Sequence, residues 1–170
     1  MSPTYGGIAH VTLPITDLLS AEAFYVGVLG AELRRRFDRE TFLRLRPGRE
    51  AEADADNSPL HLELGFGGPG ELHLFVQRGH RPRAPAPHPH VAFEVTPAVL
   101  DEIAARLSSE GVPMDGPRRL GPPGHASLYF VDPFGHLLEA TTMGYARAIP
   151  LGPPDVEALG RAFATKHDVA

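Results

Sequence analysis

The sequence contains no cysteine. This absence excludes disulfides, thiolate nucleophiles, iron–sulfur clusters and cysteine-ligated zinc. Long apolar runs are also missing, since none approaches the roughly 20 residues that span a bilayer. The opening residues, MSPTYGGIAH, lack the charged start and apolar stretch of a signal peptide. Together these absences predict a cytoplasmic protein that makes no use of a membrane.

An excess of positive charge is absent as well. Lysine and arginine number 16 against 21 aspartates and glutamates, for a net charge of −5. The densest basic run, Arg34 to Arg36, fits a solvated strand face. We therefore expect no nucleic-acid partner. The length of 170 residues and the 42% hydrophobic content predict a single globular domain over residues 1–170.

A seven-residue phrase occurs in two versions, HVTLPIT at residues 10–16 and HVAFEVT at residues 90–96. Each version alternates in the manner of a half-buried strand, and we expect its apolar face to pack under helices. That alternation places His10 and His90 on the opposite face of each strand. The apolar faces are Val11, Leu13 and Ile15 in the first version, and Val91, Phe93 and Val95 in the second.

Each phrase is followed by a helical pattern and then by strand-like runs. The helices are predicted over 17–30 and 96–111, each ended by a glycine. Predicted strands follow at 31–38, 41–46 and 71–77 in the first half, and at 113–120, 126–131 and 136–142 in the second. Residues 49–59 are interpreted as a polar loop insertion, and the pattern leaves open whether residues 60–66 form a further strand.

This order predicts an α+β fold made of tandem βαβββ modules. Module one covers about 6–78, a proline-rich linker covers 79–88, and module two covers about 89–143. A tail at 144–170 contains a short predicted helix, VEALGRAFATKH, to which the sequence gives no chemical role.

Two histidines at equivalent positions of a repeat suggest a shared ligand. Two imidazoles and one carboxylate hold a first-row divalent metal and leave positions open for a substrate. Glu139 is the candidate carboxylate, because an unpaired charge in its otherwise apolar strand would be costly. Taken singly, His10, His90 and Glu139 could each be an ordinary hydrogen-bonded or solvated strand residue. Their occurrence at repeated positions favours metal binding.

The motifs IAHVTLPITD, AFYVGVLGAEL, HVAFEV and SLYFVDPFGHLLEATT together resemble the vicinal oxygen chelate superfamily. This superfamily includes glyoxalase I, fosfomycin-resistance enzymes, extradiol dioxygenases and bleomycin-resistance proteins. The resemblance covers most of residues 8–142. It implies two βαβββ modules that form an open, barrel-like mixed sheet around one divalent metal. It also implies that His10, His90 and Glu139 are the metal ligands.

Further site residues follow only from the resemblance. The family's fourth ligand position falls on His73 if the last strand of module one is residues 71–77, or on Glu63 if it is the run at 60–66. Thr12 and Tyr129 match substrate-contacting residues of the fosfomycin enzymes, and Tyr129 could act as a general acid or orient an oxyanion. His125 is expected to be a solvated loop residue.

The resemblance implies a metal-dependent enzyme that chelates neighbouring oxygens of a small-molecule substrate and stabilises an anionic intermediate. The chemistry would be of lyase, isomerase or thiol-transferase type, the last with a thiol cosubstrate. The metal could be Mn, Fe, Ni, Co or Zn. The loop GPRRLGPPGHAS does not reproduce the cation-binding loop of the fosfomycin enzymes.

Two alternatives remain open, an extradiol dioxygenase and a metal-free antibiotic-sequestering protein like the bleomycin-resistance proteins. The second usually lacks the ligand set and has an aromatic-lined groove, whereas this chain has no tryptophan. A homodimer is expected from the resemblance, with modules either swapped or unswapped between the chains.

Overall fold

The computed structural model of the chain describes residues 7–167. The chain divides into two compact units, Met1–His80 and Arg81–Ala170. None of the helices in the described range is both long and apolar enough to cross a membrane.

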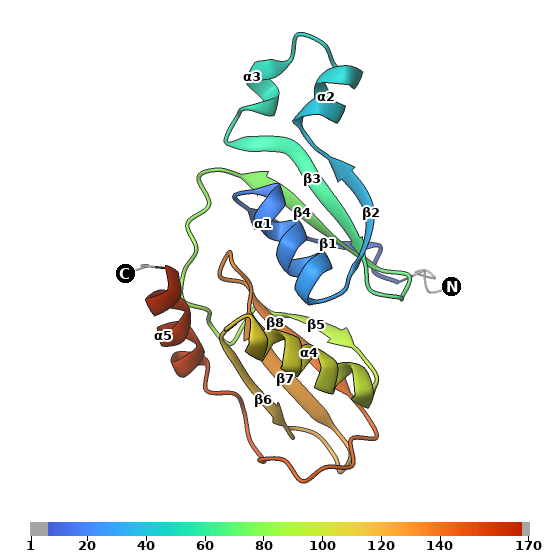
Figure 1. The fold of residues 1–170 in the computed structure, drawn as a ribbon, viewed down its shortest axis with the longest axis vertical. Helices are drawn as coiled ribbons and strands as arrows, with labels where there is room; N and C mark the ends of the chain where they lie inside the picture. Colours follow the sequence, from blue (N-terminus) through green and yellow to red (C-terminus); the bar gives the residue numbers. More distant parts are fainter. Residues whose placement is uncertain (1–6, 168–170) are drawn as a thin grey trace, which may run out of the picture. The chain divides into compact units, whose positions relative to one another are not determined.

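The first unit is a mixed four-stranded sheet with a helix across one face (Figure 1). Its strand order is β1-β4-β3-β2, in which β1 and β4 are parallel and the other pairs antiparallel. In chain order its elements are β1 (His10–Ile15), α1 (Leu18–Glu22), the π-helix η1 (Ala23–Val28), β2 (Glu32–Phe37), α2 (Arg39–Leu45), α3 (Glu50–Ala53), β3 (Asn57–Gly65) and β4 (Glu71–Gln77).

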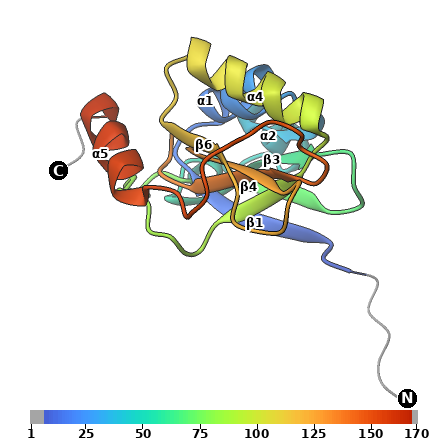
Figure 2. The ribbon, with the colours of Figure 1, turned by 90° about the horizontal axis from the view of Figure 1, so that it is seen from below.

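The second unit repeats this topology. Its sheet has the order β5-β8-β7-β6, again with the first pair parallel and the others antiparallel. Figure 2 shows α4 lying above β6, on one side of the sheet. The elements are β5 (Val91–Glu94), α4 (Pro97–Ser109), β6 (Met114–Arg118), β7 (Ala126–Val131), β8 (Leu137–Thr142) and α5 (Val156–His167). The predicted α+β class with two βαβββ modules is therefore confirmed.

Alternation along β3 and β4 separates an apolar face from a polar one. Leu62 and Leu64 on β3 and Leu72 and Leu74 on β4 are buried. The residues between them are polar and partly buried, and they point to the other side of the sheet because successive strand residues alternate. The first unit thus buries its leucines on one face and presents histidines and carboxylates on the other.

In the second unit, α5 covers part of the face that carries Tyr129. Tyr129 and Val131 share one face of β7, and both pack in a buried cluster with Leu159 and Phe163 of α5. The sequence predicted the α5 helix correctly, but its amphipathic pattern did not say which surface it covers.

One predicted strand was wrong. Residues 41–45 belong to helix α2, and Arg46 is its C-cap. The strand that pairs with β2 is instead β3, which includes residues 60–65 of the run that the sequence left open. Asp38 begins α2 because its side chain accepts a hydrogen bond from the Thr41 backbone N–H at 2.9 Å. Phe42 then anchors the helix, since its side chain is fully buried. The predicted polar loop at 49–59 contains α3 and the first residues of β3.

The first predicted helix is correct in its place and its end but changes type. It passes from α1 into η1, in which the Leu29 N–H bonds to the Phe24 carbonyl five residues back. In this stretch Tyr25 is fully buried, whereas Val28 is only partly buried. The helix predicted over 96–111 is α4, and the strand predicted at 113–120 is β6. The prediction that Val11 packs under a helix was wrong, because its side chain is 37% exposed on the edge strand β1.

The start of α5 is tied to β6 through Asp115. The Asp115 carboxylate accepts hydrogen bonds from Arg118 Nε and from the backbone N–H of Asp155, both at 2.7 Å. Burial alone would raise the pKa of Asp115, but these two hydrogen bonds and the charge of Arg118 hold it below its ordinary value of 3.8. A carboxyl whose pKa is lower in the folded state stabilises the fold above its unfolded pKa and loses that effect as the pH falls through its folded pKa.

We therefore predict that Asp115→Asn lowers the free energy of unfolding by about 1 kcal/mol at neutral pH, the size of one partly exposed charged hydrogen bond. The difference from the wild type should persist down to about pH 4 and shrink in stronger acid. Urea unfolding at a series of pH values measures it, with the exposed Glu94→Gln as the control. A difference that stayed constant or grew below pH 4 would contradict this assignment.

Candidate functional site

In the first unit, strand register gathers the predicted residues of that half on one face of the sheet. Because β1 runs parallel to β4, His10 pairs with Glu71 and Thr12 pairs with His73. On the other side of β4, Glu63 of β3 pairs with His73. Residues paired across a sheet point to the same side, so all five side chains share the polar face.

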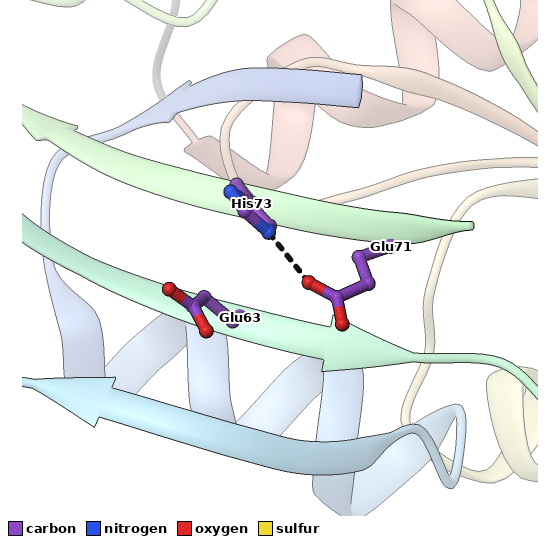
Figure 3. Close-up of side chains that lie close together, drawn as sticks. All are labelled: Glu63, Glu71 and His73. Atoms are coloured by element: carbon purple, nitrogen blue, oxygen red, sulfur yellow. Dashed lines mark hydrogen bonds and ion pairs between the residues drawn. The ribbon is translucent and has the colours of Figure 1, made fainter. Parts of the chain in front are cut away.

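Three of these residues form a compact group of ligand atoms. His73 Nε2 lies 2.8 Å from Glu71 Oε2. Figure 3 marks this contact with a dashed line. Glu63, Glu71 and His73 each offer one ligand atom, and these atoms lie within 4.8 Å of one another. The His10 and His73 rings stack with centroids 4.4 Å apart. By chemistry and spacing, the carboxylates and the imidazole of the three-residue group could hold a divalent ion.

Arginines from β2 already balance the two carboxylates of this group. Arg34 Nη1 lies 2.6 Å from Glu71 Oε1, and Arg35 Nε lies 3.2 Å from Glu63 Oε2. The hydrogen bond with His73 and then the one with Arg34 hold the pKa of Glu71 below its ordinary value. The charges of the two carboxylates are thus balanced by neighbouring side chains of the protein. The arginines at 34–36 were interpreted from the sequence as a solvated face, but Arg34 and Arg35 have these specific partners, and Arg36 pairs with Glu22 and Asp38.

In the second unit, the two predicted ligands of that half lie side by side. His90 Nε2 is 3.0 Å from Glu139 Oε2, and His90 Nδ1 is 3.1 Å from the carbonyl oxygen of Pro87. Both ring nitrogens therefore face an acceptor, whereas a neutral imidazole has one N–H to donate. If that N–H is on Nδ1 and donates a hydrogen bond to the Pro87 carbonyl, the Nε2 lone pair and the Glu139 carboxylate converge on one point. A cation, either a proton or a metal ion, completes this arrangement.

Glu139 is held in place from the other side. Its side chain is buried, and Ser127 Oγ donates a hydrogen bond to its Oε1 at 2.5 Å. The Ser127 hydroxyl also lies 3.0 Å from the Thr141 hydroxyl. One carboxylate oxygen is thus fixed by Ser127, while the other faces His90. A metal-binding carboxylate is commonly supported by hydrogen bonds in this way.

Tyr129 lies beside the pair, directly across the β7–β8 ladder from Glu139. Burial, followed by the negative charge of Glu139 and a hydrogen bond with it, raises the pKa of Tyr129 to about 12. The phenol therefore keeps its proton at neutral pH and lies at this face as a hydrogen-bond donor to Glu139.

His125 is better fixed than the sequence suggested. It was expected to be a solvated loop residue, but Nδ1 accepts a hydrogen bond from the Gly121 N–H at 3.2 Å. Its Nε2 lies 3.2 Å from the Thr141 hydroxyl and 3.4 Å from the Ser127 hydroxyl. His125 is therefore part of the polar network that ends at Glu139.

The structure thus brings the predicted residues together in two groups, one in each unit. His10, Thr12, His73 and Glu63 share a face of the first sheet, and His90, Tyr129 and Glu139 share a face of the second. Sequence reasoning missed the support from Ser127. A signal for it was present, because Ser127 lies two residues before Tyr129 on the same strand and must point to the same side.

The family model and the solved structures that resemble this chain agree with each other. Comparison with curated proteins gave no match. Among solved structures, a glyoxalase family protein from Bacillus anthracis is 23% identical, with a TM-score of 0.57, over 84% of this chain and 99% of its own. The fosfomycin resistance protein FosX from Listeria monocytogenes is 20% identical, with a TM-score of 0.58, over 82% of this chain and 94% of its own.

A mutant of the same FosX, solved with Mn(II) and 1S,2S-dihydroxypropylphosphonic acid, has a TM-score of 0.59 at 20% identity, over 82% of this chain and 94% of its own. At these identities the structures share the fold with this chain. The family model described as "Glyoxalase/Bleomycin resistance protein/Dioxygenase superfamily" matches residues 7–140. The chain, with its two βαβββ units, belongs to the glyoxalase/bleomycin resistance protein/dioxygenase superfamily.

Proposed function

We propose that this chain is a divalent-metal-dependent enzyme that binds a small substrate through two neighbouring oxygens and stabilises an anionic intermediate of it. His90 and Glu139 are the ligands contributed by the second unit. His10, at the equivalent position of the first unit, is the third ligand, and His73 is the fourth. The chemistry is of lyase, isomerase or thiol-transferase type.

The geometry of His90 carries this proposal. Its two nitrogens lie close to two acceptors, the Pro87 carbonyl and the Glu139 carboxylate. Metal-binding histidines typically donate their second N–H to a backbone carbonyl, which fixes the tautomer and aims the other nitrogen at the metal. Two ligand atoms about 2.0–2.2 Å from one ion stand roughly 3 Å apart, and His90 Nε2 and Glu139 Oε2 are separated by 3.0 Å. The donor set therefore fits a first-row divalent ion.

When bound, such an ion would supply Lewis-acid stabilisation of negative charge on substrate oxygens. The chain's own residues do the rest. Ser127 keeps the Glu139 carboxylate oriented, and His90 is held by Pro87. Tyr129, whose hydroxyl faces Glu139 in the free protein, would donate instead to a substrate oxygen as that oxygen becomes negative, which lowers the barrier. Thr12 is the candidate substrate contact from the first unit.

The choice between His73 and Glu63 as fourth ligand is helped by their surroundings. Glu63 is paired with Arg35 and lies 3.2 Å from His61. His73 is stacked on His10, the proposed third ligand. His73 is therefore the better candidate. Superfamily proteins resembling this chain usually act as homodimers, and we propose the same here, with His10 contributed by either chain of the pair.

Metal content tests the proposal directly. The protein, purified without an affinity tag and dialysed, is loaded in turn with Mn(II), Fe(II), Ni(II), Co(II) and Zn(II), and bound metal is measured by mass spectrometry. We expect about one tightly held ion per chain for at least one of these metals. His90→Ala and Glu139→Gln should each weaken binding by more than the roughly 100-fold that loss of a supporting residue can cost.

Two variants provide matched controls for these substitutions. His167→Ala removes a histidine at the end of α5, and Glu102→Gln neutralises an exposed carboxylate on α4, so both should bind metal like the wild type. Failure to bind stoichiometric metal under any loading would contradict the proposal. A metal-free protein that sequesters small molecules would then be the better account.

The support from Ser127 generates a second prediction. Ser127→Ala should keep the metal stoichiometry but weaken the affinity about 10–100-fold, because the Glu139 carboxylate loses its orienting hydrogen bond. Competition titration with a metal-sensitive dye measures the affinity. Ser58→Ala is the control, since Ser58 is also buried and donates to a backbone carbonyl in the first unit. Equal affinities in the Ser127→Ala variant and the wild type would show that Glu139 is not positioned in this way.

A further inference from the structure

A pocket of about 500 Å³ opens beside His90 and Tyr129, entirely within the second unit. Sites for small molecules typically have volumes of about 300–1,000 Å³. Most of its lining is apolar and comes from the linker, from a loop, from β8 and from the C-terminal segment. The apolar lining residues are Pro87, Leu120, Leu137, Pro153, Pro154 and Val156.

The C-terminal wall of this pocket is fixed in place. Leu151 forms a parallel β-bridge with Arg119, whose backbone bonds to Pro150 and Gly152 at 2.9 and 3.0 Å. The Asp115 carboxylate holds the Asp155 N–H at the start of α5. At the other end of the helix, Lys166 Nζ lies 3.2 Å from the carbonyl oxygens of Glu110 and Gly111. The segment is therefore a built wall of the pocket, anchored at both ends of α5.

Close packing on the linker side completes this wall. A Cβ added to Gly160 of α5 would come within 3.2 Å of the Ala84 side chain. Val156 packs against the buried cluster that contains Tyr129. Tyr129, the proposed substrate contact, and Val156, which lines the pocket, thus pack in the same cluster. The match to the family model ends at residue 140, so residues 151–157 of this wall lie outside the matched range.

The charges around the pocket select against anions. Asp155 and Glu157 line it, and among its lining residues in the described range none is lysine or arginine. Glu157 has Arg161 as an ion-pair partner at 3.7 Å, but both side chains are largely exposed and such a pair is weak. Asp155 accepts a hydrogen bond from the Ala158 N–H at 2.8 Å as it caps α5, and so its carboxylate is held at this position. Two carboxylates beside an apolar surface repel a phosphonate or carboxylate group, while an uncharged apolar group is favoured by burial.

We infer that this pocket is the subsite for an uncharged, apolar part of the substrate, and that residues 153–157 impose that preference. The inference rests on the proposed function, because His90 and Tyr129 connect the pocket to the proposed metal ligands. A substrate of this class has two neighbouring oxygens at one end and an alkyl or aryl group at the other. It therefore differs from the phosphonic acid seen in the FosX structure.

Binding to metal-free protein tests the pocket by itself. The probes are 4-propylphenol, which is neutral, and phenylphosphonate, which is anionic, and neither has the two neighbouring oxygens of the proposed substrate. Titration of ¹⁵N-labelled protein should show the neutral probe binding at least about tenfold more tightly, with shifts at Leu120, Val156 and Tyr129. Tighter binding of phenylphosphonate, or no binding of 4-propylphenol, would overturn the inference.

A charge placed in the pocket sharpens this test. Leu120 is 46% exposed, so Leu120→Lys should fold normally while adding a cation to the lining. We predict that it weakens 4-propylphenol binding about tenfold and strengthens phenylphosphonate binding. Leu151→Lys is the matched control, because Leu151 is 69% exposed and is not among the residues that line the pocket. Equal effects of the two substitutions would contradict the assignment.

A third probe separates this inference from the proposed function. 4-Propylcatechol has neighbouring oxygens and the same apolar group, and its affinity is measured with and without Mn(II). A gain of about tenfold or more with the metal, abolished in Glu139→Gln, would show that pocket and metal act on one ligand. If 4-propylphenol binds the pocket but Mn(II) adds nothing for 4-propylcatechol, the pocket is not a subsite of the proposed metal centre and the inference fails. A protein that binds no metal at all is recognised independently from the metal content.

Discussion

The buried carboxylate of Glu139 is the constraint on which the second unit depends. A carboxylate that leaves water is costly unless each oxygen finds a partner. Ser127 serves one oxygen and His90 the other, and His90 is in turn fixed by the Pro87 carbonyl. These contacts join β7, β8 and the linker around a single negative charge. A divalent cation between His90 and Glu139 would bind both groups and balance the negative charge.

The two units show how one topology supports different local chemistry. In the first unit, Glu63 and Glu71 face Arg35 and Arg34 from the neighbouring strand, so their charges are balanced by the protein itself. Each of these glutamates also faces a histidine, His73 or His61. Among the described residues, Glu139 has His90 as its ion-pair partner and no arginine, so its charge is not already balanced by a fixed cation. This difference in partners explains why the second unit is the better candidate for the main ligand pair, although the first contains more carboxylates on its polar face.

Local patterns predicted much of this arrangement from the sequence. The repeated phrase identified the two modules, and the resemblance to the superfamily named Tyr129 and Glu139 as site residues. The pattern failed at residues 41–46, where the cap at Asp38 and the burial of Phe42 make a helix from a strand-like run. It also could not place α5, because the choice of Tyr129 and Val131 as its packing surface depends on contacts distant in sequence. The pairing of the β2 arginines with particular glutamates depends on register and was equally inaccessible.

The most direct test of the account is to locate the metal in crystals grown with Mn(II), using anomalous scattering at the manganese edge. The account predicts one strong peak per chain, at about 2.2 Å from His90 Nε2 and a Glu139 oxygen, with His10 of the same chain or of a partner chain as a further ligand. The map would also show which chain supplies His10. A peak at Glu63, Glu71 and His73 without His90 and Glu139, or no peak at all, would contradict the account.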